Sequence, residues 1–140
     1  MYQKDLLGIE ETQAAISAML EESAKDPRPI SIAIVDDMGE MLYFVKKDGA
    51  RTMNSQLAVK KAYTSSRMRT DSGAFAQRLK EQGRSAADYG DPNLMGVQGG
   101  VCILKPGTQT CLGGIGVSGW AAHEDEALAR SGLEAMGLGE

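Results

Sequence analysis

The segment 111–129, CLGGIGVSGWAAHEDEALA, places the tightest limits on how this chain can fold. It begins as an apolar run with three glycines among its first six residues. That pattern indicates a strand whose backbone is approached closely by another chain or a ligand. The run breaks at Ser118 and Gly119, and a helix with an acidic start follows. Because free N–H groups at a helix start favour an anion, we interpret Gly116, Ser118 and Gly119 as the floor of a small-molecule site.

Length and charge exclude several classes of protein. The 140 residues predict one domain, 1–140, with enough chain to bury a core. The net charge of −4, with no basic stripe, argues against non-specific nucleic-acid binding. No run approaches the roughly 18 apolar residues that span a bilayer, and the N-terminus has no apolar signal core. We therefore expect a cytoplasmic protein with neither nucleic-acid nor membrane partners.

The first half of the chain predicts a helix followed by a hairpin. The helix covers residues 5–25 and stops at the Asp-Pro-Arg-Pro sequence that follows, because proline cannot continue its hydrogen bonds. Strands are expected at 30–36 and 40–47, joined by an Asp-Met-Gly turn. The first strand alternates bulky isoleucines with smaller residues, which predicts a central strand covered on both faces. The apolar face of the helix is predicted to comprise Leu6, Ile9, Ile16 and Leu20.

The second half predicts two helices, a long loop and a second hairpin. A helix from about 55 to 68 carries a narrow face of Ala58, Ala62 and Ser65, suited to close packing on a sheet or a twin helix. A short helix with Phe75 and Leu79 buried follows and ends near Gly83. Residues 84–100 read as a loop, and 101–105 pairs with the glycine-rich run. Consecutive hairpins predict a mostly antiparallel sheet, so the fold class is α+β. The tail after Met136 is expected to fray.

The two cysteines do not make a disulfide framework or a zinc site. If the second hairpin is symmetric about Pro106-Gly107, Cys102 and Cys111 lie opposite each other. A disulfide there is one alternative, and two reduced thiols are the other, which a cytoplasmic setting favours.

The candidate functional side chains fall into two groups. His123, the only histidine, lies in the first turn of the last helix beside three acidic residues; it is either an exposed side chain or a ligand or acid/base group. Trp120 is either an anchor at a subunit interface or a stacking wall for a planar ligand. The second group is a basic cluster that forms either a solvated face or an anion site shared with Ser118-Gly119: Arg51, Lys60, Lys61, Arg67 and Arg69.

Three patches, in their order and spacing, resemble the GlcG/HbpS-like family of small haem-binding proteins, related to the C-terminal domain of the PduO-type protein. They are IAIVDDMGEML (32–42) with KKDGA (46–50), LAVKKAYTSS (57–66) and GGIGVSGWAAHEDEALA (113–129). The resemblance covers nearly the whole chain. It implies an antiparallel sheet of about five strands flanked by helices, similar to profilin or roadblock domains. A fifth short strand is then expected within 94–98.

The resemblance also implies candidate ligands. Some relatives bind haem between subunits, with a histidine on the first helix as axial ligand. The first helix here has no histidine; its other candidate iron ligands are Met19, Glu10, Glu11, Glu21 and Glu22. Equivalents of Asp48, Gly49, Lys61 and Thr64 belong to the family's motif patches. Other relatives are encoded among genes for glycolate, glycerol or propanediol breakdown.

Three hypotheses about function follow. The first is a homo-oligomer, a dimer or larger, that holds haem, a related tetrapyrrole or a small carboxylic acid near 116–124. The expected ligand-binding residues are Asp48, Arg51, Lys61, Gly116, Ser118, Gly119, Trp120 and His123. The second is an accessory oligomeric subunit without its own ligand. The third is a lyase or tautomerase for a small hydroxy or oxo acid, with Lys60, Lys61 or Arg51 holding the carboxylate and His123 or Asp48 moving the proton. No metal site is expected.

Overall fold

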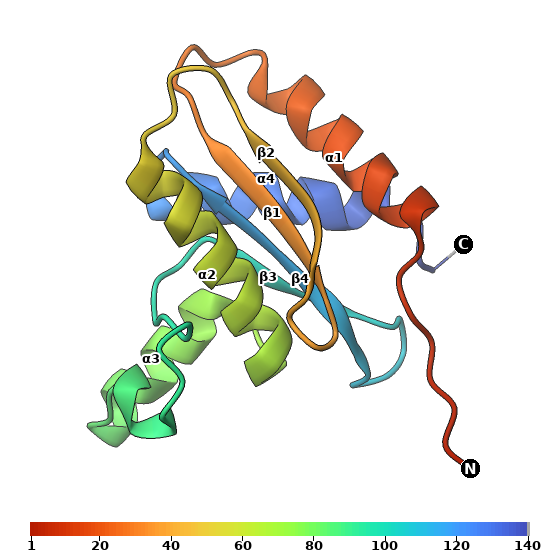
Figure 1. Ribbon diagram of the computed structural model, residues 1–140, viewed down its shortest axis with the longest axis vertical. Helices are drawn as coiled ribbons and strands as arrows, with labels where there is room; N and C mark the ends of the chain where they lie inside the picture. Colours follow the sequence, from red (N-terminus) through yellow and green to blue (C-terminus); the bar gives the residue numbers. More distant parts are fainter. Residues whose placement is uncertain (140) are drawn as a thin grey trace.

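The computed structural model describes residues 1–139, which form an antiparallel sheet between two layers of helices (Figure 1). The four strands run in the order β2-β1-β4-β3, and the α+β class predicted from the sequence is confirmed. In these residues no helix is long and apolar enough to cross a membrane. The elements are α1 (Ile9–Ser23), β1 (Ser31–Asp36), β2 (Met41–Lys46), α2 (Thr52–Met68), α3 (Ser72–Gln82), a 3₁₀ turn η1 (Ala86–Tyr89), β3 (Gly100–Leu104), β4 (Cys111–Ser118) and α4 (Ala122–Ala135).

Strand β1 lies in the centre of the sheet and is covered on both faces, as its alternation predicted. Its bulky residues Ile32 and Ile34 face α1 and α4, where they join the larger part of the core. Its smaller residues Ala33 and Val35 face α2. Figure 1 shows this division, with α2 in front of the sheet and α4 behind it. The size difference between the two faces allows α2 to lie closer to the sheet than α1 and α4 do.

Helix α1 is shorter than predicted, and its buried face is different. It begins at Ile9 because Gly8 forms the N-cap, where the Gly8 N–H donates to the Glu11 carboxylate at 3.1 Å. Leu6 and Ile9 are 62% and 76% exposed, so two of the four residues predicted to be apolar contacts face outward. The buried face instead contains Thr12, Ala15, Ile16, Met19 and Ser23.

Helices α2 and α3 follow the prediction closely. α2 begins at Thr52, three residues before the predicted start, and ends at Met68, where Arg69 adopts the left-handed conformation. Phe75 and Leu79 are buried on α3, as their spacing predicted. Asp71, at the N-cap of α3, and the adjacent Ser72 also cover the outer edge of β3. Asp71 accepts from the Cys102 N–H at 2.9 Å, and Ser72 accepts from the Gly100 N–H at 2.8 Å.

The predicted fifth strand within residues 94–98 is wrong, because this segment pairs with no strand. It is held instead by contacts with helices. The Met95 N–H donates to the Thr64 hydroxyl at 2.8 Å, and Gly96 packs against Ala76 and Leu79 of α3. The loop assignment for 84–100 is otherwise confirmed, apart from η1. The prediction that the tail frays covers residues 137–140, and Glu140 lies outside the described residues.

Candidate functional site

The glycines of β4 bring helix α2 against the sheet. A Cβ atom at Gly116 would overlap the carbonyl oxygen of Ala58, and one at Gly114 would overlap that of Ala62. The small face of α2 therefore packs directly on glycine backbone, as its residue types predicted. The element that approaches the strand at Gly114 and Gly116 is therefore a helix of the same chain, while the assignment of Gly116 to a ligand floor stays a prediction.

The helix start after β4 is occupied by carboxylates of the chain itself. Asp125 accepts from the Trp120 N–H at 2.9 Å, and Glu124 accepts from the Ala121 N–H at 3.2 Å. The Asp125 carboxylate also accepts from the Gly119 N–H, a bond that helps to stabilise its charge. An external anion would have to displace both side chains. The predicted anion site at Ser118-Gly119 is thus filled internally, and Ser118 is buried with its hydroxyl 3.3 Å from the Asn54 amide oxygen.

Lys61 and Asp125 form a buried ion pair beneath this helix start. The Lys61 ammonium donates to the Val117 carbonyl at 2.9 Å and to Asp125 at 3.3 Å, and both side chains are 3% exposed. Burial lowers the pKa of Lys61 and raises the pKa of Asp125, because each charge loses its hydration, while the pairing opposes both shifts. The pair links α2 to α4 at the C-terminal end of β4. Lys61 therefore has a structural partner and is withdrawn from solvent.

Trp120 lies in a second charged cluster at the surface. Its indole N–H donates to the Arg28 carbonyl at 3.0 Å, and the Arg28 guanidinium lies 5.1 Å from the ring centroid. Arg28 also binds both oxygens of Glu124 at 2.9 Å and pairs with Asp26 at 2.7 Å. Hydrogen bonds from Arg28 lower the pKa of Asp26 to about 2 and that of Glu124 to about 2. One face of Trp120 is therefore taken by Arg28.

The remaining predicted site residues do not assemble into a catalytic set. Asp48 and Arg51 are exposed in the turn before α2, and their side chains make no ion pair with residues 1–139. His123 is exposed in the first turn of α4. The structure brings Lys61, Ser118, Gly119 and Trp120 close together, but the polar groups of Lys61, Ser118 and Trp120 are already bonded to Val117, Asn54 and Asp125. This arrangement gives no support to the proton transfer suggested for a lyase or tautomerase.

Three of the five iron ligands suggested on the first helix are engaged in other contacts, whereas Glu10 and Glu21 are exposed. Met19 is fully buried, and its sulfur packs against Gly132 of α4. Glu11 caps its own helix, and Glu22 pairs with Lys25 at 2.8 Å. Across residues 1–139, no group of three or more His, Cys, Asp or Glu side chains is arranged to hold a metal ion.

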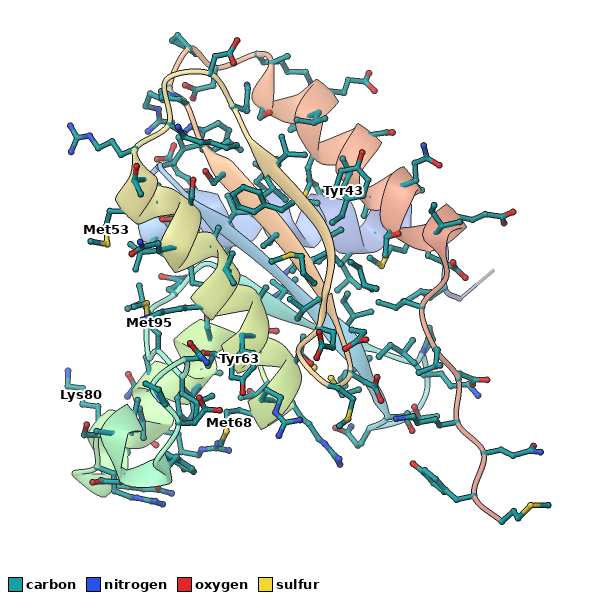
Figure 2. All side chains as sticks on the ribbon, viewed as in Figure 1. Tyr43, Met53, Tyr63, Met68, Lys80 and Met95 are labelled. Atoms are coloured by element: carbon teal, nitrogen blue, oxygen red, sulfur yellow. The ribbon has the colours of Figure 1, made fainter. Side chains whose placement is uncertain are left out.

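An apolar groove lies elsewhere, between α2 and the edge strand β2. It has a volume of about 520 Å³, within the range typical of small-molecule sites. Phe44 and Met41 of β2 form one wall and are 39% and 44% exposed, and Val59 of α2 lies opposite. Figure 2 shows Met53 pointing outward from the start of α2 and Tyr43 on the other side of β2, towards α1. The lining is Met41, Phe44, Ser55, Gln56, Val59, Lys60 and Asn93.

Two other cavities, one larger than the groove and one of similar volume, are lined by charged residues. One, of about 740 Å³, lies between the start of α3 and the end of α4 and contains the Arg130–Asp71 ion pair, whose atoms are 2.6 Å apart. The other, of about 510 Å³, is bordered by Lys4, Arg67, Arg69 and Cys111. Both are lined by charged groups, so the largest cavity is not the best match for an apolar ligand. The basic residues of α2 are thus divided, with Lys60 at the groove and Arg67 and Arg69 at the far end.

Comparison with known proteins gives the family. The model of haem-degrading HbpS-like proteins matches residues 7–134. The chain belongs to the HbpS-like family. Protein GlcG of Escherichia coli K12 is 29% identical over 118 residues, which cover 84% of this chain and 85% of GlcG. A double mutant of Streptomyces reticuli HbpS superposes with a TM-score of 0.86 at 29% identity, covering 98% of this chain and 91% of that one. A PduOC:heme complex superposes with a TM-score of 0.82 at 22% identity, covering 94% and 95%, and shows the shared fold.

The groove of this HbpS-like chain was not identified from its sequence, although a signal for it was present. Residues 41–45 are MLYFV, so both faces of the strand are apolar. An edge strand of an open sheet ordinarily carries charge or proline. Once β2 is known to be an edge, its apolar outer residues Met41 and Phe44 mark an exposed apolar surface. The sequence predicted that β1 is central, but it did not establish which strands lie on either side of it.

Proposed function

We propose that this protein binds a planar, largely apolar ligand with acidic groups, of which haem is the best candidate, in the groove between α2 and β2. The observation that carries the proposal is the exposed apolar wall formed by Met41 and Phe44 on an uncovered edge strand. Membership of a family described as haem-degrading supports it. A relative of the same fold has been crystallised as a heme complex, which is a further support.

The residues of the groove suit such a ligand. Phe44 and Val59 offer apolar contact to a flat ring system, and burying them would release water from exposed hydrocarbon. The Lys60 ammonium borders the groove and can pair with a carboxylate of the ligand. Haem iron accepts methionine sulfur as an axial ligand, and Met41 supplies a thioether in the wall. His123 is not among the lining residues, so the proposal does not depend on it.

Titration with haemin tests this proposal. The wild-type protein should give a saturable shift of the Soret band, and Phe44→Glu should weaken binding by about tenfold or more, because it places a carboxylate on the apolar wall. Val97→Glu is the matched control: Val97 is 40% exposed, close to the 39% of Phe44, and lies outside the groove. It should bind haemin like the wild type. A flat absorbance response, or equal weakening by both substitutions, would contradict the proposal.

The same strand edge favours a second candidate function, that of a self-associating subunit. The edge of β3 is covered by Asp71 and Ser72, whereas β2 carries no comparable cover among residues 1–139. The backbone N–H of Lys47 donates to the Ile30 carbonyl at 3.0 Å. Because backbone groups alternate in direction along a strand, those of Val45 and Tyr43 also point towards β1. The backbone groups of Phe44 and Lys46 then point away from the sheet. A second copy could pair with them and bury Met41 and Phe44.

Sedimentation of the ligand-free protein tests self-association. We expect the wild type and Val97→Glu to sediment as a dimer or larger at micromolar concentration. Phe44→Glu should sediment as a monomer, because like charges would face each other across the paired edges. If the wild type is monomeric but still binds haemin, the groove is a ligand site and self-association is wrong. An oligomer that Phe44→Glu leaves intact would place the subunit contact elsewhere.

A further inference from the structure

The two thiols form a close pair at the base of the β3–β4 hairpin. The sulfur atoms of Cys102 and Cys111 are 3.3 Å apart, and both are free cysteines. The register places Cys102 opposite Gly114 and Cys111 opposite Leu104, so the prediction that the two cysteines lie directly opposite each other is wrong. Their sulfur atoms nevertheless meet diagonally across the neighbouring strands, where the register shifts between Ile103 and Leu104. Cys102 is buried, whereas Cys111 is half-buried. The pair therefore consists of one thiol that solvent can reach and one that lies directly behind it.

The pair lies between two cavities, each bordered by a different cysteine. Cys111 borders the cavity of about 510 Å³ together with Arg67, Arg69 and Lys4. Cys102 borders the cavity of about 740 Å³ on the other side, and Arg69 borders both. In the first cavity Lys4 is paired with Asp37 at 2.6 Å, while Arg69 makes no ion pair with residues 1–139. Arg69 is thus an exposed cation beside the thiol pair, without an ion-pair partner among residues 1–139.

We propose that Cys111 and Cys102 form a redox-active dithiol in which Cys111 reduces hydroperoxides and Cys102 then closes an intramolecular disulfide. The proposal rests on the contact of the two sulfurs, the unequal burial of the thiols and the position of Arg69. It is independent of the α2–β2 groove, because none of its residues lines that groove.

The chemistry balances with a hydroperoxide, ROOH, as the oxidant. The Cys111 thiolate attacks the terminal peroxide oxygen; an S–O bond forms, the O–O bond breaks, and the leaving alkoxide takes a proton to give ROH. Cys111 is then a sulfenic acid, oxidised by two electrons. The Cys102 sulfur, losing its proton, attacks the Cys111 sulfur; an S–S bond forms, the S–O bond breaks, and the hydroxide leaves as water. Two thiols and one hydroperoxide thus give one disulfide, one alcohol and one water.

The local electrostatics assign the attacking role to Cys111. The hydrogen bond from the Cys102 thiol lowers the pKa of Cys111, and the Arg69 guanidinium contributes in the same direction, while burial and Asp37 oppose the shift. The pKa of Cys102 is raised well above its usual value by that hydrogen bond and by burial. Arg67 adds positive charge around the cavity that leads to Cys111, where Lys4 is paired with Asp37 and Asp5 also lines the wall. Cys111 is therefore the thiol that ionises more readily, and the buried Cys102 retains its proton.

Mass spectrometry of the reduced protein after hydrogen peroxide treatment tests the proposal. The wild type should lose the mass of two hydrogen atoms, resist alkylation and recover both thiols with dithiothreitol. Cys102→Ser should stop at a sulfenic acid on Cys111 that dimedone traps, and Cys111→Ser should form no dimedone adduct. The folded wild type should react about tenfold or more faster than the same protein unfolded in urea. A wild type that keeps two alkylatable thiols, or forms only intermolecular disulfides, would overturn the proposal.

Arg69→Gly separates the effect of charge from the effect of fold. Arg69 has a φ of 56°, a left-handed conformation that glycine adopts without strain, so this substitution removes the cation and preserves the end of α2. The pH midpoint for alkylation of Cys111 by iodoacetamide is measured in Cys102→Ser and in Cys102→Ser/Arg69→Gly. Removing the cation should move this midpoint upward, towards the pKa of ~8.5 of a free thiol. An unchanged midpoint and peroxide rate would show that Arg69 does not activate Cys111 and would overturn its assigned role.

Discussion

Replacing Lys61 with methionine should lower the free energy of unfolding by about 3–5 kcal/mol at neutral pH, because it leaves a buried carboxylate without its cation. Asp125 is held by the Trp120 N–H and by Lys61, and it is 3% exposed. Methionine fills a similar volume but cannot donate to Asp125 or to the Val117 carbonyl. The loss is a large part of the roughly 5–15 kcal/mol that a small domain has. Chemical denaturation measures it directly.

The pH dependence of this loss follows from the direction of the Asp125 shift. Burial raises the pKa of Asp125, and removing Lys61 removes an interaction that lowers it, so the folded-state pKa rises further above the unfolded value. A raised pKa of the folded-state carboxyl contributes stability at pH values below its unfolded-state pKa, which is about 4. This contribution is lost as the pH rises through the folded-state pKa. Lys61→Met should therefore be closest to the wild type in acid and furthest from it at neutral pH.

Lys60→Met is the matched control for Lys61→Met. Lys60 is the adjacent residue on α2, is partly exposed and makes no ion pair with residues 1–139, so its replacement should change stability by no more than about 0.5 kcal/mol. The double variant Lys61→Met/Asp125→Leu should lose less than the sum of the two single variants, because no buried charge remains. A Lys61→Met protein as stable as Lys60→Met would contradict a structural role for the pair.

Replacing Gly116 with alanine should destabilise the fold by about 3 kcal/mol or more, although it adds only a methyl group. The new Cβ would overlap the Ala58 carbonyl oxygen and lie 2.5 Å from the Ala62 backbone nitrogen. Both atoms belong to the backbone of α2, so no side chain can rotate away to make room. The helix would have to move off the sheet, which would weaken the contacts of Ala33 and Val35 with it. Thermal and chemical denaturation measure the effect.

Gly73→Ala makes the same chemical change with a much smaller expected effect. Gly73 lies in the first turn of α3, and a Cβ there would meet the Gln98 Cγ and Cβ atoms at 3.1 and 3.2 Å, so Gln98 must move by a few tenths of an ångström. Alanine is favoured over glycine within a helix by roughly 0.5–1 kcal/mol, which offsets this contact, so the stability should stay within about 1 kcal/mol of the wild type. If Gly116→Ala behaved like Gly73→Ala, the close contact between α2 and β4 would be wrong.

The layers of the fold could be predicted from the sequence because local patterns determined them. Ile32 and Ile34 alternate with Ala33 and Val35, which identified a strand covered on both faces. The small face of α2 and the glycines of β4 each predicted a close approach. The sequence could not show that they approach each other, because complementary small surfaces fit a second chain or a ligand equally well. The packing partner is decided by topology, which places β4 beneath α2.

The candidate site could not be predicted from the sequence to the same extent. Free N–H groups after β4 suggested a bound anion, but the side chains of Asp125 and Glu124 accept from these groups instead. The position of Asp125 depends on its ion pair with the buried Lys61, which the sequence did not reveal. The resemblance to known proteins suggested a fifth strand at 94–98, and contacts with α2 and α3 hold that segment instead. Without the strand order, the sequence did not show that Met41 and Phe44 lie on an exposed edge strand.

Backbone hydrogen exchange with and without haemin is the measurement that tests the central claim most directly. The claim is that the groove between α2 and β2 holds the ligand. Haemin should slow exchange in β2 (Met41–Lys46) and in the first half of α2, and leave the β3–β4 hairpin and α4 unchanged. Protection centred on the end of α4 and the β3–β4 hairpin, or no protection at any segment, would contradict it.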